Sequence, residues 1–395
     1  MRKVLGVAFI IGLGVMLVLV LAGRPVGAQQ PELALINPDA PDVFQVLALS
    51  DGRVLALTDA QAGLFYLPDQ GGKWRRAKGL PEVFLCFAAA DSRGRVYLAT
   101  SQGLFRSEDG FDRWANVASQ SAARLAFSPD GAAALVKVWG QGLFAVRPED
   151  LGPEGFEAEE KRRSEAAALL DEAERLEAEL LGADTQSLTP AETEEYLKKY
   201  ETWKKLTEEA EALEKKGTGW PAAGRGLPEG PAQALACDEH GRWYAGFFGA
   251  GVYQSRDLGS GWREINRGLA GRQVLVLAAG PGGEVLAGTY GGGLFRWFEK
   301  RGEWSPVGPP GLAGRIIQTA AFGPRGEALA GTREDGLYYS TDGLDAWRKA
   351  ESLPGPNVPA AAVGRAGTLW AAVSGRGLFG STDQGRTWRA AELGE

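Results

Sequence analysis

Outside one long segment, the chain repeats a fixed order of apolar and polar positions. Each unit has an apolar run, a glycine turn, a second apolar run, the phrase Gly-Leu-Phe or a close variant, and a tryptophan. These tryptophans lie 40 to 43 residues apart, except for one gap of 106 residues. Four short strands per unit and a period near 42 residues are typical of a β-propeller. The pattern predicts an all-β, seven-bladed β-propeller whose blades are marked by Trp74, Trp114, Trp220, Trp262, Trp304, Trp347 and Trp388.

A short polar motif lies before several of these tryptophans and predicts a tight turn between the third strand (C) and the fourth strand (D) of a blade. In its fullest copy, the Asp383 carboxylate can accept backbone N–H groups, Ser381 offers a hydroxyl, and Gly385 can adopt positive φ. The copies consist of Ser107, Asp109 and Trp114; Ser255, Asp257, Gly259 and Trp262; Ser340, Asp342 and Trp347; and Ser381, Asp383, Gly385 and Trp388.

These octets resemble the Asp-box, or BNR, repeats of sialidases, sortilin-type receptors, two-propeller xyloglucanases and single-propeller photosystem-assembly factors. The resemblance covers about residues 43–395 outside the long insertion, and the layout is most similar to the single-propeller proteins. It implies the propeller fold, but it implies no activity, because the boxes lie in C-to-D turns remote from the ligand-binding end. The photosystem-assembly relatives imply that an arginine-rich face can hold a client protein.

The 106-residue gap predicts an antiparallel α-helical hairpin inserted in the C-to-D turn of blade 3. Small and apolar residues step by three and four along both halves, and Thr189, Pro190 and Glu192 supply a helix start. The predicted organisation is a signal peptide at 1–28, blades 1 to 3 over 29–152, the hairpin at 153–218, and the remaining blades over 219–395. One interpretation is that the hairpin is a contact arm for a partner or for self-association. The alternative is that its two apolar stripes pack only against each other. The two stripes are Ala166, Leu169, Ala173, Leu176 and Leu180, and Tyr196, Trp203, Leu206, Ala210 and Leu213.

The N-terminus predicts export. Arg2 and Lys3 precede an apolar run over 4–22, and small residues end at Ala28, as in a cleaved secretory signal. The alternative is an uncleaved anchor helix, and either form places the chain in the periplasm, at the cell surface or in the medium. Residues 33–37 fall where an outer strand could pair beside the last blade and help to close the ring.

Composition and charge narrow the possible partners. The net charge is -7, and residues 157–216 alone hold 18 acidic and 10 basic side chains, so the propeller is nearly neutral. This balance gives no support to nucleic-acid binding, and the acidic arm does not suit an anionic membrane surface. Cys86 and Cys237 fall in the innermost strands (A) of two separated blades, which predicts buried thiols without a disulfide.

Candidate ligand-binding residues gather where the loops between the second (B) and third (C) strands meet the approaches from D to the next A strand. Three aromatic residues and several arginines at this end suit a planar or anionic ligand. In the alternative, the aromatic residues plug the channel and the arginines are ordinary surface charges. The predicted ligand-binding residues are Trp139, Phe248, Tyr290, Arg272, Arg315, Arg333, Glu334 and Arg376, with Asp59, Glu82 and Arg124 at the same end.

Catalytic and metal chemistry have little support in the sequence. His240 is the only histidine and lies in a turn between strands A and B, which excludes a serine–histidine–aspartate triad and multi-histidine metal sites. Tyr290 with Glu334 and nearby arginines could imitate a sialidase site, but the sialidase pattern is otherwise incomplete. We therefore predict no catalytic residues, no metal and no cofactor. The predicted function is an exported propeller that binds or scaffolds a protein or glycan in the cell envelope; the alternative is a glycoside hydrolase of sialidase-like type.

Overall fold

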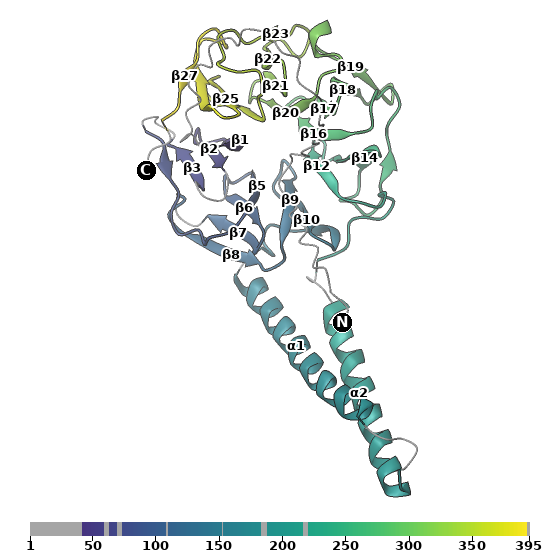
Figure 1. Ribbon diagram of the computed structural model, residues 1–395. Coiled ribbons are helices and arrows are strands. Elements are labelled where there is room, and N and C mark those ends of the chain that lie inside the picture. The colour runs from purple at the N-terminus through teal and green to yellow at the C-terminus, as the bar shows by residue number, and fades with distance from the viewer. Residues whose placement is uncertain are drawn as a thin grey trace, which may run out of the picture.

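The computed structural model is a ring of seven antiparallel sheets from which a pair of helices projects (Figure 1). It describes residues 42–58, 63–68, 73–107, 110–151, 153–182, 188–215 and 220–392. Each sheet holds strands in sequence order, so that A lies at the axis and D at the outside. The predicted seven-bladed propeller is confirmed, whereas the predicted signal segment and the strand at 33–37 lie outside the described residues.

The strands follow the four-stranded unit in six blades, and blade 3 has three named strands. Blades 1 to 3 contain β1 (Val43–Ala48), β2 (Val54–Thr58), β3 (Leu64–Leu67), β4 (Arg75–Arg76); β5 (Leu85–Ala90), β6 (Val96–Thr100), β7 (Gly103–Ser107), β8 (Trp114–Ala118); and β9 (Ala122–Phe127), β10 (Ala134–Val138), β11 (Gly142–Val146). Blades 4 and 5 contain β12 (Ala232–Cys237), β13 (Trp243–Phe247), β14 (Gly251–Ser255), β15 (Arg263–Glu264); and β16 (Val274–Ala279), β17 (Val285–Thr289), β18 (Leu294–Phe298), β19 (Glu303–Pro306). Blades 6 and 7 contain β20 (Ile317–Phe322), β21 (Ala328–Thr332), β22 (Leu337–Ser340), β23 (Arg348–Lys349); and β24 (Ala360–Val363), β25 (Leu369–Val373), β26 (Gly377–Ser381), β27 (Arg389–Ala390). A short helix, η1 (Pro310–Leu312), precedes β20.

The B strands form the buried layer of each blade because both faces of a blade pack on neighbouring blades. β2, β6, β10, β13, β17 and β21 are buried at every position. A strand that is buried on both faces needs a continuous apolar run rather than alternation. The A strands are half-buried at several positions because they surround the axial channel.

Adjacent blades approach one another closely at the penultimate residue of several B strands. A Cβ added to Gly246 would lie 2.6 Å from a side-chain carbon of Val274, and one added to Gly288 would lie 2.6 Å from Ile317. These distances leave no room for a side chain beside the neighbouring A strand. The tight turn of the sequence motif is therefore only one of the reasons why this fold is rich in glycine.

The motif tryptophans join neighbouring blades near the outer edge. The Trp262 indole N–H donates to the Ala223 carbonyl of the preceding blade at 2.7 Å, and Trp304 donates to Ile265 at 2.6 Å. At Gly268, which has a φ of +81°, an added Cβ would lie 2.1 Å from the Trp304 carbonyl oxygen. The phrase Arg-Gly-Leu, which follows Trp220 and Trp262, thus makes room for the backbone of the next blade.

The predicted C-to-D turns form the expected hydrogen bonds. Ser381 Oγ donates to Asp383 Oδ1 at 2.8 Å, and the same carboxylate accepts the N–H of Thr387 at 2.9 Å. These hydrogen bonds hold the pKa of Asp383 well below its usual range. The Ser255–Asp257 turn and the Ser340–Asp342 turn repeat the side-chain bond at 2.6 and 2.9 Å, whereas Asp109 lies outside the described residues.

The first and last blades close the ring by packing. Val43 and Val46 of blade 1 pack with alanines of β24 and β25, and Trp74 meets Trp370 edge to face at 5.4 Å. The Asp42 carboxylate also accepts the N–H of Gly375 at 2.9 Å. Blade 7 supplies all four of its own strands, so none of the described residues crosses from one end of the chain to complete it.

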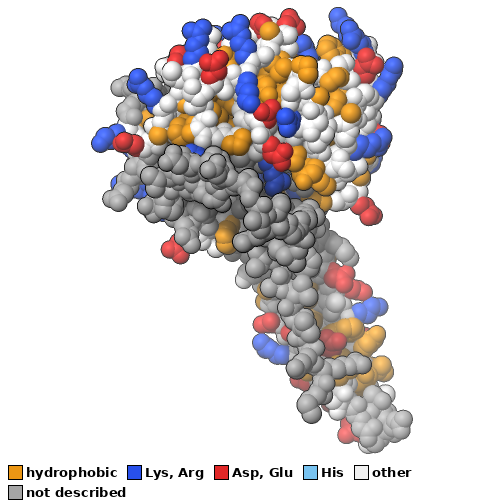
Figure 2. Space-filling model, turned by 45° about the horizontal axis from the view of Figure 1, so that its top comes forward, with side chains coloured by type: hydrophobic (Ala, Val, Ile, Leu, Met, Phe, Trp, Pro, Cys, Tyr) orange, Lys and Arg blue, Asp and Glu red, His pale blue; other side chains and the backbone are white. Residues whose placement is uncertain are grey.

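The two helices form the predicted hairpin. α1 (Pro153–Leu181) and α2 (Pro190–Lys215) lie against each other and project from the ring (Figure 1). Thr189 and Glu192 exchange the predicted capping bonds, and Ala166, Ala173 and Ala210 are buried in the seam. The hairpin lies between β11 and the bridge from Phe144 to Ala222, which is the C-to-D connection of blade 3. Figure 2 shows acidic, basic and hydrophobic side chains interspersed along the face of the hairpin that it displays.

A network of charges joins blades 4 and 5 at Glu299. Its carboxylate accepts hydrogen bonds from Trp297 at 2.7 Å, from Gln254 at 2.9 Å and from Arg256, and Arg242 lies at 3.5 Å. Burial raises the pKa of Glu299, but these hydrogen bonds outweigh burial and hold that pKa at about 2. The carboxylate therefore stabilises the fold as an anion.

Glu299→Gln should lower the free energy of unfolding at pH 7 by about 1–3 kcal/mol, because charge-assisted hydrogen bonds are lost. The folded-state pKa lies below the unfolded value, so the contribution is present above about pH 4.5 and is lost as the pH falls toward 2. Urea unfolding of the wild type and of Glu299→Gln should therefore show a smaller difference in unfolding free energy at pH 3 than at pH 7. Glu303→Gln, which removes one exposed ion pair with Arg267, should cost less than about 0.5 kcal/mol. Equal losses for both variants would contradict the assignment.

Candidate functional site

Four exposed aromatic or large apolar side chains lie at one end of the propeller. Phe84, Trp139, Phe248 and Tyr290 are 62%, 41%, 52% and 46% exposed, one on each of blades 2 to 5. Within the described residues, every other large hydrophobic side chain with comparable exposure belongs to the hairpin. We call these four residues the aromatic rim. Sequence reasoning identified three of them and missed Phe84.

The backbone positions the aromatic rim at equivalent places in the repeat. Trp139, Phe248 and Tyr290 each follow directly after a B strand, whereas Phe84 precedes the A strand β5. The N–H of Ser101, the residue equivalent to Trp139 in blade 2, donates to the Phe84 carbonyl at 3.1 Å. Phe84 could have been found from the sequence, because it is aromatic whereas the residues at the equivalent position of the following blades are not. Those residues are Ser121, Pro231, Gln273 and Ile316.

Two members of the rim contact each other directly. The Phe248 and Tyr290 rings lie 5.9 Å apart at an interplanar angle of 68°, which is an edge-to-face arrangement. Phe248 pairs with Gln273, and Tyr290 pairs with Ile316, through isolated β-bridges between blades. These bridges fix the backbone beneath both rings. The rim is therefore preformed at this point.

The predicted arginines at this end are held by separate partners. Arg272 lies 3.4 Å from Glu264, and Arg315 lies 3.6 Å from Asp335. Asp335, which the sequence analysis did not select, also pairs with Lys349 and accepts the Tyr338 hydroxyl at 2.7 Å. These contacts hold the pKa of Asp335 below its usual range. Arg272 and Arg315 thus serve two different acidic groups.

The remaining predicted residues lie at the same end without forming one cluster. Arg333 and Glu334 are exposed, and Arg376 is half-buried beside Gly355. Within the described residues, no hydrogen bond joins Tyr290 to Glu334, and neither Arg333 nor Arg376 belongs to an ion pair. Glu82 is exposed, and Asp59 lies outside the described residues. The predicted ligand-binding residues that the structure describes therefore share one end of the propeller but do not line one pocket.

The expected position of Arg124 in the approach to strand A was wrong. Arg124 lies inside β9, opposite Lys137 of β10, because a bulge at Ala123 shifts the register of the two strands. The bulge turns the Arg124 side chain toward the axial channel. There the guanidinium donates to the carbonyls of Gln233 at 3.0 Å and Cys86 at 3.3 Å, which belong to the blades on either side.

Lys137 is a buried cation that the sequence analysis missed. Its ammonium group donates to the Ala232 carbonyl at 3.1 Å and lies 5.0 Å from the centre of the Trp139 ring. Burial, and then the charge of Arg124, lower the pKa of Lys137 to about 8. We call Arg124 and Lys137 the channel pair. A lysine within the apolar run of a B strand was the sequence signal that could have identified it.

The thiols and the histidine take no part in this site as reactive groups. Both cysteines are free and half-buried, so the predicted absence of a disulfide is confirmed but their burial is only partial. Burial raises the pKa of the Cys86 thiol, and burial with Asp238 raises that of Cys237 to about 12. His240 lies in the predicted turn between β12 and β13 and is exposed.

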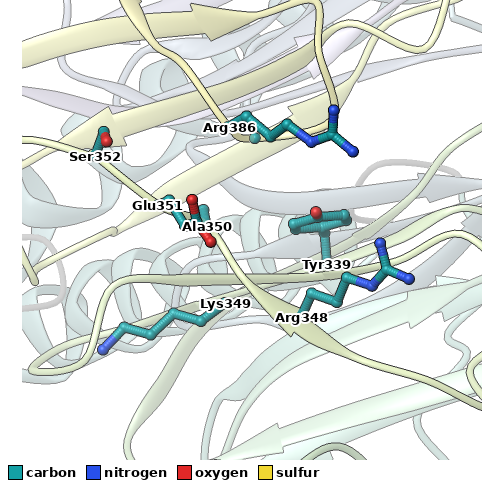
Figure 3. Close-up of a pocket in the computed structure, with 8 residues that line it drawn as sticks. Tyr339, Arg348, Lys349, Ala350, Glu351, Ser352 and Arg386 are labelled. Carbon is teal, nitrogen blue, oxygen red and sulfur yellow. The ribbon is translucent and has the colours of Figure 1, made fainter.

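A separate pocket of about 790 Å³ lies at the seam between blades 6 and 7, near their outer strands. Arg348 and Arg386 extend on either side of Tyr339, while Glu351 and Ser352 lie farther along its wall (Figure 3). Both arginines are exposed, and the pocket is lined mainly by blade 6, with Gly385 and Arg386 from the C-to-D turn of blade 7, so it is separate from the aromatic rim. It does not contribute to the predicted site.

In the part of the chain that the structure describes, histidine, cysteine, aspartate and glutamate side chains form no group of three that could hold a metal ion. Neither of the two long helices is apolar enough to cross a membrane.

No protein-family model matches the chain, and no curated protein sequence matches it either. Solved structures share its fold, which makes the chain a member of the seven-bladed propeller class. The extracellular domain of BT4673 from B. thetaiotaomicron, named as part of a hybrid two-component system, has a TM-score of 0.56 at 14% identity, over 87% of this chain and 38% of that chain. The GH74 enzyme of Niastella koreensis has a TM-score of 0.56 at 13% identity, over 88% of this chain and 54% of that chain. A chain of the mitotic checkpoint complex has a TM-score of 0.54 at 11% identity, over 90% of this chain and 98% of that chain.

These likenesses show the fold alone. The chain spans only 38% of the BT4673 domain and about half of the Niastella koreensis enzyme. One of these proteins is named as an extracellular domain and another as an enzyme, so the neighbours leave binding and hydrolysis equally open. The choice between binding and hydrolysis therefore depends on the residues of the site.

The lowered pKa of Lys137 predicts a pH-dependent cost of folding. Between about pH 8 and 10.5 the unfolded chain binds a proton that the folded chain has lost, so this residue adds stability as the pH rises through that window. Relative to Lys137→Met, the wild type should gain about 1–2 kcal/mol of unfolding free energy from pH 7.5 to 10.5, after allowance for water in the channel. Urea unfolding across that range measures the gain. Lys137→Arg does not titrate there and should follow the methionine variant; parallel curves for all three proteins would refute the prediction.

Proposed function

We propose that the chain is an exported, non-catalytic binding module that holds a protein partner against the aromatic rim. The observation that supports this most strongly is the position of the rim: all four exposed large apolar side chains of the described propeller lie at one end, on consecutive blades. Aromatic anchors with arginines around them are typical of the residues that contribute most to protein interfaces. Arg272 and Arg315 supply such a border.

The geometry of the rim favours a protein over a glycan. Phe248 and Tyr290 meet edge to face, so they form a ridge rather than one flat stacking surface. Apolar side chains of a partner can pack on both sides of that ridge and exclude water from it. A glycan remains the alternative ligand, and the experiment below tests both.

Export and family membership are further parts of the proposal. The apolar run over 4–22 and the small residues before Ala28 support a signal peptide at 1–28, with the protein acting in the cell envelope. The hydrogen bonds in the turns at Ser255, Ser340 and Ser381 support assignment to the Asp-box repeat proteins. We also propose 153–218 as a separate structural unit that serves as a second contact surface.

A glycoside hydrolase of sialidase-like type is the second candidate. Tyr290 of blade 5 and Glu334 of blade 6 occupy neighbouring blades at the same end, which is the observation that favours it. This function would require a carboxylate close to the reacting sugar and a second group to assist it. Turnover of a chromogenic sialoside that is abolished in Glu334→Gln would establish the hydrolase.

Replacing two rim residues should weaken partner binding. A photo-crosslinking amino acid at position 84 should capture the partner in whole cells, and Phe248→Ala with Tyr290→Ala should reduce that capture. With the captured protein purified, the double variant should bind it about 30- to 1,000-fold more weakly, because each of the two buried anchors contributes about 1–2 kcal/mol. Titration calorimetry with purified envelope glycans, run in parallel, tests the alternative ligand.

The control is Lys300→Ala in the turn between β18 and β19, because Lys300 is exposed and belongs neither to the aromatic rim nor to the hairpin. This variant should leave capture at position 84 unchanged. Equal capture by the wild type and by the rim double variant would reject the rim as the binding surface. Glycan binding that depends on Phe248 and Tyr290, without protein capture, would replace the protein partner with a glycan.

The hairpin offers a separate test of self-association. Leu181, Leu197 and Tyr200 are exposed in the half of the hairpin that contains its loop. If two copies associate through these side chains, Leu197→Lys should raise the dissociation constant of the oligomer at least 10-fold, as measured by sedimentation equilibrium. If the wild type is still monomeric at a protein concentration of about 100 μM, self-association through the hairpin is excluded, because a weaker dissociation constant would be of little use.

A further inference from the structure

Blade 3 differs from all other blades at one layer of the axial channel. The channel pair consists of directly opposed residues of strands A and B, one layer inside the aromatic rim. At the equivalent cross-strand positions, none of the other six blades carries a charged residue. Those pairs are Gln45 and Leu57, Phe87 and Ala99, Ala234 and Gly246, Val276 and Gly288, Thr319 and Gly331, and Ala360 and Ala372.

The next blade leaves room for the Lys137 side chain. The A strand that faces it begins with Ala232, whereas the corresponding residues of later blades are Val274 and Ile317. In those seams the B-strand residue is glycine, and an added Cβ would collide with the valine or isoleucine. A small residue in blade 4 is thus matched to a long one in blade 3. The lysine is accommodated by its surroundings.

The channel pair lacks a counter-ion in the part of the chain that the structure describes. No carboxylate there lies within ion-pair distance of Arg124 or Lys137, and the acceptors of both are backbone carbonyls. Like charges opposite each other in a sheet destabilise it, and burial adds to the cost. The same protein compensates Arg315 and Lys349 of blade 6 with Asp335. An anion would therefore compensate the two positive charges of Arg124 and Lys137.

The carbonyl contacts orient the pair and leave donors toward the axis. Arg124 uses Nε for Gln233 and Nη1 for Cys86 and Ala123, so the two N–H groups of Nη2 have no acceptor among the described residues. The Lys137 ammonium donates to one carbonyl out of its three N–H groups. Phe87, 4.8 Å from the Arg124 guanidinium, and Trp139, 5.0 Å from the Lys137 ammonium, supply apolar walls.

We propose that Arg124 and Lys137 form a binding site for the carboxylate of a ligand that enters the axial channel past Trp139. One carboxylate oxygen accepts from Arg124 Nη2 and the other from Lys137 Nζ. The aromatic walls of Phe87 and Trp139 pack against the group that bears the carboxylate. This site deepens the proposed function and rests on it for the direction of entry, because the rim surrounds the same mouth of the channel. It names the part of the partner that the channel recognises.

Calorimetric titration with N-acetylphenylalanine and with its carboxamide tests the site, because the two probes differ only in the carboxylate. The wild-type protein should bind the acid and bind the amide at least about 10-fold more weakly, the loss expected for one charge-assisted hydrogen bond. Lys137→Met should weaken binding of the acid by about the same factor. Lys349→Met, which removes a lysine of blade 6, should leave binding unchanged. Equal binding of acid and amide, or a Lys137→Met variant that binds as the wild type does, would overturn the proposal.

A second measurement does not depend on how well the methionine variant folds. Raising the pH from 7 to 10 should weaken binding to the wild type as Lys137 loses its proton, whereas Lys137→Arg should retain binding. Arg124 and the Cys86 thiol are the other titratable groups that face the pair, and both are common to the two proteins. Parallel pH profiles for the wild type and Lys137→Arg would also overturn the site.

The source of the carboxylate follows from a third probe. N-acetylaspartic acid α-amide carries its carboxylate on a side chain, whereas N-acetylphenylalanine carries it at the chain end. Tighter binding of the latter assigns the site to a polypeptide C-terminus, and tighter binding of the former assigns it to an acidic side chain. Loss of acid binding with intact crosslinking at position 84 would remove the channel site and leave the rim as a partner surface. Intact acid binding without crosslinking at position 84 would keep the channel site and reject the rim as a partner surface.

Discussion

The close approach of neighbouring blades at the axis constrains the rest of the structure. At Gly246, Gly288 and Gly331, even a methyl group would collide with the start of the next blade, so these three contacts limit how far the neighbouring blades can separate. The contacts bury the B strands on both faces and make them continuously apolar. Farther out, the gap between blades widens, and the fold fills it with the indoles of Trp262 and Trp304. Small residues at the axis and large ones at the edge are two results of the same wedge shape.

This wedge explains which features the sequence predicts well. Strand order, blade number and the place of the hairpin all follow from local patterns, namely the apolar run, the turn glycine and the indole. The hairpin interface was also predictable, because Ala166, Ala173 and Ala210 recur at helical spacing. The hydrogen bonds at Asp383 were predictable for the same reason, since every group involved lies within a few residues of it.

The candidate site was predicted only in part, because its geometry depends on bulges and on contacts between blades. Trp139, Phe248 and Tyr290 were identified from their common place after a B strand. Arg124 was misplaced, since the bulge at Ala123 is visible only in the pairing of β9 with β10. Arg315 was expected to face a ligand, but its partner Asp335 comes from a loop that follows a separate strand.

Blade 3 concentrates the departures from the repeat. It carries the hairpin in its outer turn, the uncompensated channel pair at its inner edge, and Trp139 directly after its B strand. Trp139 and Lys137 are two residues apart on one strand, so a group that displaces the indole also changes the surroundings of the ammonium. A carboxylate bound there would remove the repulsion that Arg124 and Lys137 exert on each other, and ligand binding would stabilise the seam between blades 3 and 4. Ala232 makes room for the lysine in that seam, so the ligand would act on the inner edge of the same blade whose outer turn carries the hairpin.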